Sequence, residues 1–382
     1  MKKAINHGLM KTINRQRILD FIRKKSPVSK KDVADSLETS ITSVSTVFNE
    51  LLQEEKIVHC GTSQSTGGRK SELFQLNPDA LYIIGVDIQV SQLIFVLLNL
   101  NGAVVLTNTI KINDTDEWST VSLLKKEIES LCKHAGIEFS KIGGIGIGIP
   151  GIVNQDLGLV EFAPNLGWKN VFLSELLALD FPIFIENEAN AAAWGEKTFG
   201  AARLSESLIY ISIDIGVGTG LIFGNRIFGG ANNYAGEFGH MTINPEGPIC
   251  QCGNQGCWET YVSNKAAIKR YQEKSGHQAL TYEEFLNKLR NGDPVAVAVN
   301  TEIILYLGIG IANITNSLNP ETIIIGGAIS EVKDIIYTDL IKEIKNRCLE
   351  KTFTSLSLRF SEFNGKASAL GVASILLDKL FK

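Results

Sequence analysis

Three features are missing or scarce in the sequence, and each excludes a class of protein. No run of 18 apolar residues occurs, so no segment is predicted to span a membrane. The basic N-terminus lacks the apolar stretch of a secretory signal peptide, which predicts a cytoplasmic protein. Six cysteines among 382 residues are too few for a disulfide scaffold. In a reducing compartment, a tight cysteine cluster is instead typical of a metal site.

Length and charge predict several domains with different partners. A chain of 382 residues predicts two or three domains. Residues 1–76 contain 13 Lys and Arg against 8 Asp and Glu, a formal charge of +5, whereas the remainder contains 24 against 33, or −9. A basic segment on an acidic body predicts that only this segment contacts a polyanion.

Residues 1–76 have the pattern of a winged helix-turn-helix DNA-binding domain. Apolar residues recur with helical period over residues 14–26 and again from residue 41, and Ser29 can cap a shorter helix between them. Residues 56–76 predict two strands around a glycine-rich tip, which is the wing. A polar helix face alone is common to any small helical bundle, but the basic tip, the wing and the charge distribution favour DNA binding. The predicted DNA-contacting residues are Thr42, Ser43, Ser45, Thr46, Asn49, Arg69 and Lys70.

The remainder predicts two α/β lobes with a cleft between them. A strand, an aspartate and a hairpin occur in this order twice, with the aspartates Asp87 and Asp214 lying 127 residues apart. Further apolar strands alternate with helical stretches, which is typical of α/β lobes. The first lobe is assigned to residues 80–190, together with a C-terminal helix at about residues 366–382. The second lobe is assigned to residues 191–365.

Two glycine-rich segments resemble nucleotide-binding motifs. Residues 146–151 formally match G-x-G-x-x-G, but Pro150 lies inside the motif and no helix begins there, so a buried strand ending in a turn is predicted instead. Residues 214–220, DIGVGTG, could cradle a phosphate with backbone N–H groups or form a tight β-turn that needs positive φ. The matching first copy, DIQVSQ, has no glycine, and its side chains would crowd a phosphate.

Polar residues at predicted loop and helix starts are candidates for binding a polyhydroxyl ligand. Asn187 and Glu188 stand at a strand-to-helix junction, where they either cap the helix or point into the cleft. Asn165 lies in a loop that also carries Trp168. Amides and carboxylates suit hydroxyl groups, because each hydroxyl both donates and accepts a hydrogen bond.

The segment CQCGNQGCWE carries the strongest chemical signal. Its C-x-C-x4-C spacing, with His240 ten residues upstream, predicts a Cys3His zinc set. Four protein ligands leave no open position, which indicates structural rather than catalytic zinc. The metal would hold the loop so that Glu237, His240 and Glu259 face the cleft, with the second nitrogen of His240 free to contact a ligand.

The motifs GIGIPG, PNLGW, ENEANAAAWGE, DIGVGTG, GEFGHMTI and CQCGNQGCWET together resemble the ROK family of repressors, open reading frames and sugar kinases. Three of the segments look like the xylose-repressor branch of that family. The resemblance implies an actin/hexokinase-like (ribonuclease H-like) fold and a homodimer or higher homo-oligomer. It implies that zinc binds His240, Cys250, Cys252 and Cys257. It also implies that sugar contacts fall on Asn165, Asn187, Glu188, Glu237, His240 and Glu259.

The sequence departs from the kinase members at two positions. Their first phosphate turn is glycine-rich where this chain reads DIQVSQ, and their catalytic aspartate is replaced by Glu188. A base displaced by about 1 Å can lose on the order of 100-fold in rate. The sequence therefore predicts no enzyme. It predicts a sugar-responsive repressor that binds operator DNA as a dimer and is released by a monosaccharide, with xylose favoured and glucose possible. The alternative is an ATP-dependent sugar kinase.

Overall fold

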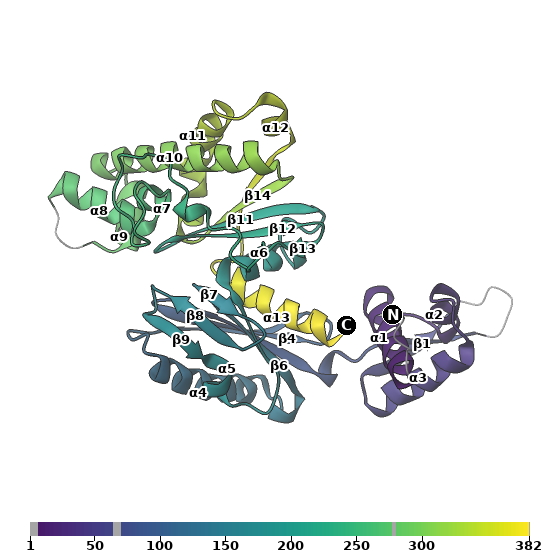
Figure 1. The fold of residues 1–382 in the computed structure, drawn as a ribbon. Helices are drawn as coiled ribbons and strands as arrows, with labels where there is room; N and C mark the ends of the chain where they lie inside the picture. The colour runs from purple at the N-terminus through teal and green to yellow at the C-terminus, as the bar shows by residue number, and fades with distance from the viewer. Residues whose placement is uncertain (1–6, 64–69, 277–279, 382) are drawn as a thin grey trace.

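The computed structural model describes residues 7–63, 70–276 and 280–381. As predicted, a winged helix-turn-helix head, here the residues up to Leu76, precedes a body of two α/β lobes. Figure 1 shows the two lobes one above the other, with the head beside the lower one. The last helix of the chain ends beside the head.

Three helices and a two-stranded wing form the head. They are α1 (His7–Lys25), α2 (Lys30–Ser36), α3 (Ile41–Gln53), β1 (Ile57–Thr62) and β2 (Glu72–Leu76). Ser29 begins α2 through a capping box: its hydroxyl accepts from the N–H of Asp32, and its own N–H donates to the Asp32 carboxylate. Helix α1 begins well before the predicted residue 14. The wing tip, with the predicted contact Arg69, lies outside the described residues.

A five-stranded mixed sheet, in the order β10-β6-β3-β4-β5, forms the first lobe. Its strands are β3 (Tyr82–Ile88), β4 (Gln92–Asn99), β5 (Val104–Lys111), β6 (Ile142–Ile149) and β10 (Ile183–Asn187). One face packs against α4 (Glu117–Ala135) and α5 (Leu173–Leu177). A small sheet of β7 (Ile152–Asn154), β8 (Leu159–Ala163) and β9 (Trp168–Phe172) adjoins it. Residues 146–151 therefore end a buried strand, as predicted, and no helix begins there.

The second lobe repeats this arrangement. Its sheet, in the order β13-β12-β11-β14-β15, contains β11 (Ser207–Ile213), β12 (Val217–Phe223), β13 (Arg226–Ile227), β14 (Thr322–Gly326) and β15 (Ser357–Phe360). In both lobes the first strand pairs antiparallel with the next strand and parallel with a later one, which confirms the predicted repeat. The helices of this lobe are α7 (Glu259–Val262), α8 (Asn264–Ser275), α9 (Tyr282–Arg290), α10 (Pro294–Leu318), α11 (Lys333–Lys345) and α12 (Glu350–Ser355).

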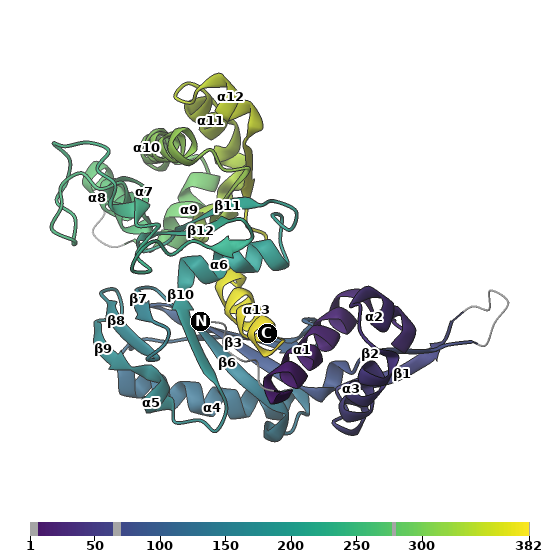
Figure 2. The same ribbon diagram turned by 45° about the vertical axis from the view of Figure 1, so that its right-hand side comes forward.

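Two helices cross between the lobes. Helix α6 (Glu188–Thr198) packs on the second sheet, and α13 (Ala367–Leu380) packs on the free face of the first sheet. Figures 1 and 2 both place the two helices against one another. Their backbones touch, because a Cβ at Gly371 would collide with the carbonyl of Ala191, and one at Gly195 would collide with that of Ala367.

Helix α10 is long and apolar enough to cross a membrane by length and composition, and it is the one such helix in the described part of the chain. Of its most apolar window, 56% is buried inside the structure. Ile303, Leu307, Ile311 and Ile314 belong to the core of the second lobe. The apolar character of α10 is therefore explained by its place in the core.

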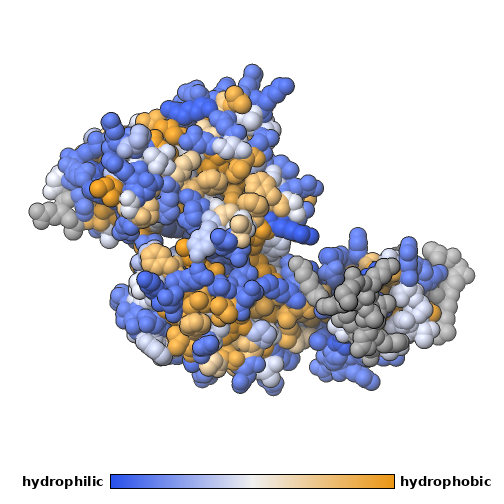
Figure 3. All heavy atoms as spheres, viewed as in Figure 1, coloured by the Kyte–Doolittle hydropathy of each residue, from blue (hydrophilic) through white to orange (hydrophobic). Residues whose placement is uncertain are grey.

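Figure 3 shows a mainly hydrophilic outer surface, with hydrophobic residues gathered over the middle of the lower lobe and beside the junction of the lobes.

Candidate ligand cleft and metal centre

A cleft of about 860 Å³ lies between the two lobes. Its walls come from the turn after β3, the β7–β8 hairpin, the start of α6, the β11–β12 turn and the cysteine loop. The residues predicted to contact sugar all line it, although they come from distant parts of the sequence. They are Asn165, Asn187, Glu188, Glu237, His240 and Glu259.

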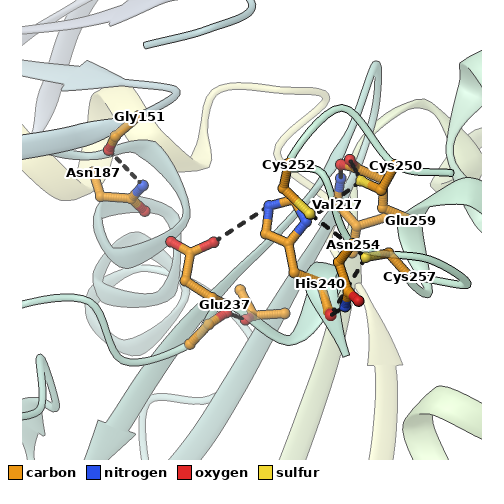
Figure 4. Close-up of polar contacts among 12 residues, drawn as sticks. Gly151, Asn187, Val217, Glu237, His240, Cys250, Cys252, Asn254, Cys257 and Glu259 are labelled. Atoms are coloured by element: carbon orange, nitrogen blue, oxygen red, sulfur yellow. Dashed lines mark hydrogen bonds and ion pairs between the residues drawn. The ribbon is translucent and has the colours of Figure 1, made fainter. Parts of the chain in front are cut away.

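Asn187 is the N-cap of α6 and is also anchored to the first lobe. Its side-chain oxygen accepts from the N–H groups of Ala189 at 2.9 Å and Asn190 at 3.1 Å. Its amide nitrogen donates to the carbonyl of Gly151 at 3.0 Å (Figure 4). An amide has two N–H donors, so this arrangement leaves one for a ligand. The capping and cleft-facing interpretations of Asn187 are therefore compatible.

Glu188 lies near two other carboxyl groups, that of Asp214 in the cleft lining and that of Asp87 buried behind it. Burial raises the pKa of Glu188 to about 8, and the charges of Asp87 and Asp214 add to the effect. Burial also raises the pKa of Asp87 and that of Asp214 to about 6 each. At neutral pH the neutral form of Glu188 predominates, so its carboxyl group can donate a hydrogen bond to a ligand hydroxyl.

The turn at residues 214–220 is filled by carboxylates. The N–H of Val217 donates to Glu259 Oε2 at 3.1 Å. A Cβ on Gly216 would lie 2.6 Å from the same oxygen, and one on Gly218 would lie 3.0 Å from Glu188 Oε1. None of the glycines of this turn has positive φ in the described backbone, which excludes the alternative of a tight turn that needs positive φ. The glycines make room for the carboxyl groups of Glu188 and Glu259, which occupy the space that a phosphate would need.

The four predicted metal ligands converge on one point. One donor atom from each of His240, Cys250, Cys252 and Cys257 lies within 4.8 Å of all the others. The Sγ atoms of Cys252 and Cys257 are 3.7 Å apart, and Cys250 Sγ is 3.7 Å from His240 Nδ1 (Figure 4). Tetrahedral zinc with Zn–S bonds of about 2.3 Å places two sulfurs about 3.8 Å apart. The donor set and its spacing therefore fit a metal such as zinc.

Short-range backbone contacts shape the cysteine loop. Cys250 N–H donates to the Asn254 carbonyl at 2.8 Å, and Gly253 N–H donates to the Cys250 carbonyl at 3.0 Å. Gly253 has φ of 89°, which favours glycine at this point of the turn. The turn brings Cys252 toward Cys257, whose backbone bridges to Thr242 near His240.

His240 and Glu259 join the metal centre to the cleft. His240 directs Nδ1 toward Cys250, whereas Nε2 lies 3.8 Å from Glu237 Oε2 on the cleft side (Figure 4). Glu259 places Oε1 3.4 Å from Cys250 Sγ and Oε2 on Val217. Movement of the cysteine loop would therefore displace the polar wall of the cleft directly.

Three further cleft residues were missed by the sequence reasoning. Gln155 Nε2 donates to Glu186 Oε2 at 2.6 Å, and Lys265 Nζ donates to Asn165 Oδ1 at 3.4 Å across the cleft. Asn190 has a buried side-chain oxygen without a partner in the described part of the chain. Asn190 follows Asn187 by three residues on the same helix face, which was a usable signal. Gln155 and Lys265 carried none.

The predicted DNA-contacting residues of α3 share one face of that helix. Thr42, Ser43, Thr46 and Asn49 are exposed and Ser45 is half-buried, while Val44, Val47, Phe48 and Leu51 face the core. Lys70, just before β2, is also exposed. The hydroxyl of Thr46 donates to the carbonyl of Thr42 at 3.1 Å. The outward face is thus small and polar, as a surface that approaches a groove must be.

The fold and the site define a two-lobed α/β protein with a polar interlobe cleft, a Cys3His donor cluster that fits a metal, and a winged helix-turn-helix head. A family model described as the ROK family matches residues 83–379, and the chain belongs to the ROK family. The xylose repressor of Bacillus subtilis (strain 168) is 34% identical over 371 residues, which cover 97% of this chain and 96% of that protein.

Two solved structures of the family, one a regulator and one a kinase, match this chain to different extents. A ROK family transcriptional regulator, a homologue of the E. coli MLC protein, superposes with a TM-score of 0.82 at 29% identity and covers 97% of this chain and 98% of its own. A ROK family glucokinase from Streptomyces griseus, in complex with glucose and AMPPNP, superposes with a TM-score of 0.69 at 27% identity. This match covers 77% of this chain and 98% of the glucokinase chain. The chain is a xylose-repressor-like regulator of this family over its full length, whereas the kinase matches it only in part.

Proposed function

We propose that the protein is a sugar-responsive transcriptional repressor that binds operator DNA as a dimer and is released by a monosaccharide, with D-xylose favoured and D-glucose possible. The proposal rests mainly on one observation: a helix-turn-helix head and a polar interlobe cleft occur in one chain that matches a xylose repressor over 97% of its length.

The chemistry of the cleft suits a neutral sugar. Asn165 and Asn187 offer amides, Glu237 and Glu259 offer carboxylates, and Glu188 offers a carboxyl group whose raised pKa favours the neutral form. A sugar hydroxyl needs both donors and acceptors, and a mixed set supplies both. His240 completes the set through Nε2, which is directed away from the sulfurs.

Zinc would be structural in this protein. His240, Cys250, Cys252 and Cys257 supply the four donors of a tetrahedral site, so no position stays open for a water or a substrate. The metal would instead hold the loop that places Glu259 on the β11–β12 turn. Stability and sugar affinity would then both depend on the metal.

The head would contact operator DNA through α3 and the wing. Thr42, Ser43, Ser45, Thr46 and Asn49 would face the major groove, and Arg69 and Lys70 would reach the backbone or the minor groove. Two heads on a dimer would match a palindromic site. Sugar releases the DNA only if it binds the released conformation more tightly than the DNA-bound one.

A kinase activity has less support. The retained carboxyl groups Glu188 and Asp214 and the glucokinase likeness favour it. The first turn argues against it, because Gln89 donates to Asp87 at 2.6 Å and occupies the place of a glycine-rich phosphate loop. Sugar-dependent ATP consumption that disappears in Glu188→Gln would replace the repressor proposal with the kinase.

The repressor proposal is tested by fluorescence anisotropy on DNA from upstream of the protein's own gene, titrated with D-xylose and then with D-glucose in the absence of ATP, at stated salt. Release by one sugar is the expected result and identifies the effector. Absence of specific DNA binding would contradict the proposal.

A further inference from the structure

Helix α13 connects Asp87, buried behind the cleft lining, to the head. At its first turn, the Ser368 hydroxyl donates to Asp87 Oδ1 at 2.7 Å, and both side chains are buried. Near its last turn, Asp378 accepts from Arg23 Nη1 of α1 at 2.6 Å. Ser368 and Asp378 are ten positions apart, which corresponds to about 15 Å along the helix. One straight element therefore bridges two sites that the sequence places far apart.

The head end of α13 is firmly attached. The Arg23 guanidinium lies 4.6 Å from the centroid of the Phe381 ring, in addition to its ion pair with Asp378. Ile18 and Ile22 of α1 belong to the same hydrophobic cluster as Leu377 and Phe381. Figures 1 and 2 both show the C-terminal end of α13 beside the head. A displacement of this end would therefore carry α1 with it.

The cleft end of α13 is engaged with α6, which begins at the candidate sugar contacts. Asn187 and Glu188 stand at the start of α6, and Gly195 near its end touches the backbone of α13. Contact between two backbones leaves no flexible side chain to absorb a shift, so movement of α6 is passed to α13. Asp87, held by Ser368, also lies close enough to Glu188 to raise the pKa of that carboxyl.

The opposite side of α13 lies directly on a glycine strip of the first sheet. Gly85, Gly146 and Gly148 face it, and a Cβ on any of them would collide with the helix. The three glycines carry no side chains that a small shear of the helix would have to repack along this strip. Gly146 and Gly148, two glycines of the segment that resembles a nucleotide motif in the sequence, serve this packing instead.

We propose that α13 transmits occupancy of the cleft to the DNA-binding head, and that Ser368 and the Arg23–Asp378 pair are positioning residues for the sugar response. This inference rests on the proposed function, because it assigns a route to the response. Sugar bound at the start of α6 shifts α6, α6 displaces α13, and α13 reorients α1 with the rest of the head.

The test compares Ser368→Ala and Asp378→Asn with matched controls. Ser205→Ala removes a half-buried hydroxyl of the second lobe, which contacts Thr322 Oγ1 at 2.8 Å away from the cleft lining and from α13. Lys24→Gln removes the exposed neighbouring ion pair of α1 with Asp20. For each full-length protein, operator affinity is measured by anisotropy with and without sugar, sugar affinity by calorimetry, and folding by thermal denaturation.

Allosteric coupling commonly changes affinity by about 5- to 150-fold. In Ser368→Ala and Asp378→Asn, the factor by which sugar weakens operator binding should fall toward one. Sugar-free operator affinity and operator-free sugar affinity should stay within about twofold of wild type, as for substitutions at independent sites. The control variants should keep the full factor. The charge exchange Arg23→Asp with Asp378→Arg should restore the response lost in Asp378→Arg alone, which separates coupling from misfolding.

Two results would overturn the proposal, and they differ. If wild type responds to sugar and Ser368→Ala and Asp378→Asn respond equally, the route is wrong and the repressor function stands. If wild type binds operator but ignores sugar, the proposed function fails and the route fails with it.

Discussion

The carboxylate of Glu259 accepts the backbone N–H of Val217 at 3.1 Å, which joins the cysteine loop to the turn between β11 and β12. This turn is the glycine-rich segment that could otherwise cradle a phosphate. A carboxylate in that position uses the N–H donor and adds negative charge. The relationship explains how a glycine-rich turn of this kind can serve a sugar cleft without serving a nucleotide.

Glu259→Ala should abolish the sugar response while the protein still binds operator. Loss of a charged hydrogen-bonding group of this kind costs about 1.5–3 kcal/mol, or roughly 10- to 150-fold in sugar affinity. Calorimetry with the sugar and anisotropy on operator DNA measure the two effects separately. Glu246→Ala, in the same loop but away from the cleft, is the control. An unchanged sugar affinity in Glu259→Ala would remove this residue from the site.

Cys252→Ser should release the metal and lower the melting temperature. Loss of a group that only supports a ligand costs about 10- to 100-fold in metal affinity, so loss of a ligand should exceed about 100-fold. Elemental analysis of protein purified without chelator should find zinc in wild type and little in the variant. Cys60→Ser, an exposed cysteine of the head, should retain the metal. Zinc-free wild type with full stability would contradict the structural role.

Stability should fall as pH rises through neutrality, in part because of Glu188. Its pKa is raised from 4.5 to about 8, mainly by burial. The unfolded carboxyl ionises first, so the stability associated with this group is fully present below pH 4.5 and is lost as pH rises to about 8. Glu188→Gln should therefore gain melting temperature relative to wild type between pH 5 and pH 9. Glu206→Gln, on an exposed side chain, is the control. Parallel profiles for Glu188→Gln and wild type would refute the assignment.

Asn49→Ala should weaken operator binding and leave sugar affinity unchanged. Asn49 is exposed on the outward face of α3, and loss of a good base contact costs about 1–3 kcal/mol, or roughly 5- to 150-fold. Anisotropy at fixed salt measures the change. Asn108→Ala, an exposed asparagine of β5, should have no effect on either affinity. Equal operator affinity for Asn49→Ala and wild type would place the DNA contacts elsewhere.

Local patterns were sufficient to predict the elements and the metal set. The helical period of α3, the cap at Ser29 and the repeated strand–Asp–hairpin unit each depend on residues close together in the sequence. The cysteine spacing predicted a cluster that the structure places within 4.8 Å. Helix ends were less exact: α1 begins at His7, whereas the helical period was traced only from residue 14.

Long-range contacts could not be predicted in the same way. Ser368 and Asp87 are 281 residues apart, and Arg23 and Asp378 are 355 residues apart, so no spacing rule links them. The role of the glycines in DIGVGTG could not be predicted either, because the carboxyl groups that fill the space beside them come from other segments of the chain. Such contacts become visible only when the two lobes and the head are brought together.

Reciprocal binding tests the central claim, that the cleft and the head are coupled, most directly. Sugar affinity is measured by calorimetry for the protein alone and for the protein saturated with operator DNA. Thermodynamic linkage requires that operator weaken sugar binding by the same factor by which sugar weakens operator binding. We predict that the two factors are equal and greater than one. The same sugar affinity in both states, or no sugar binding in either state, would contradict the account.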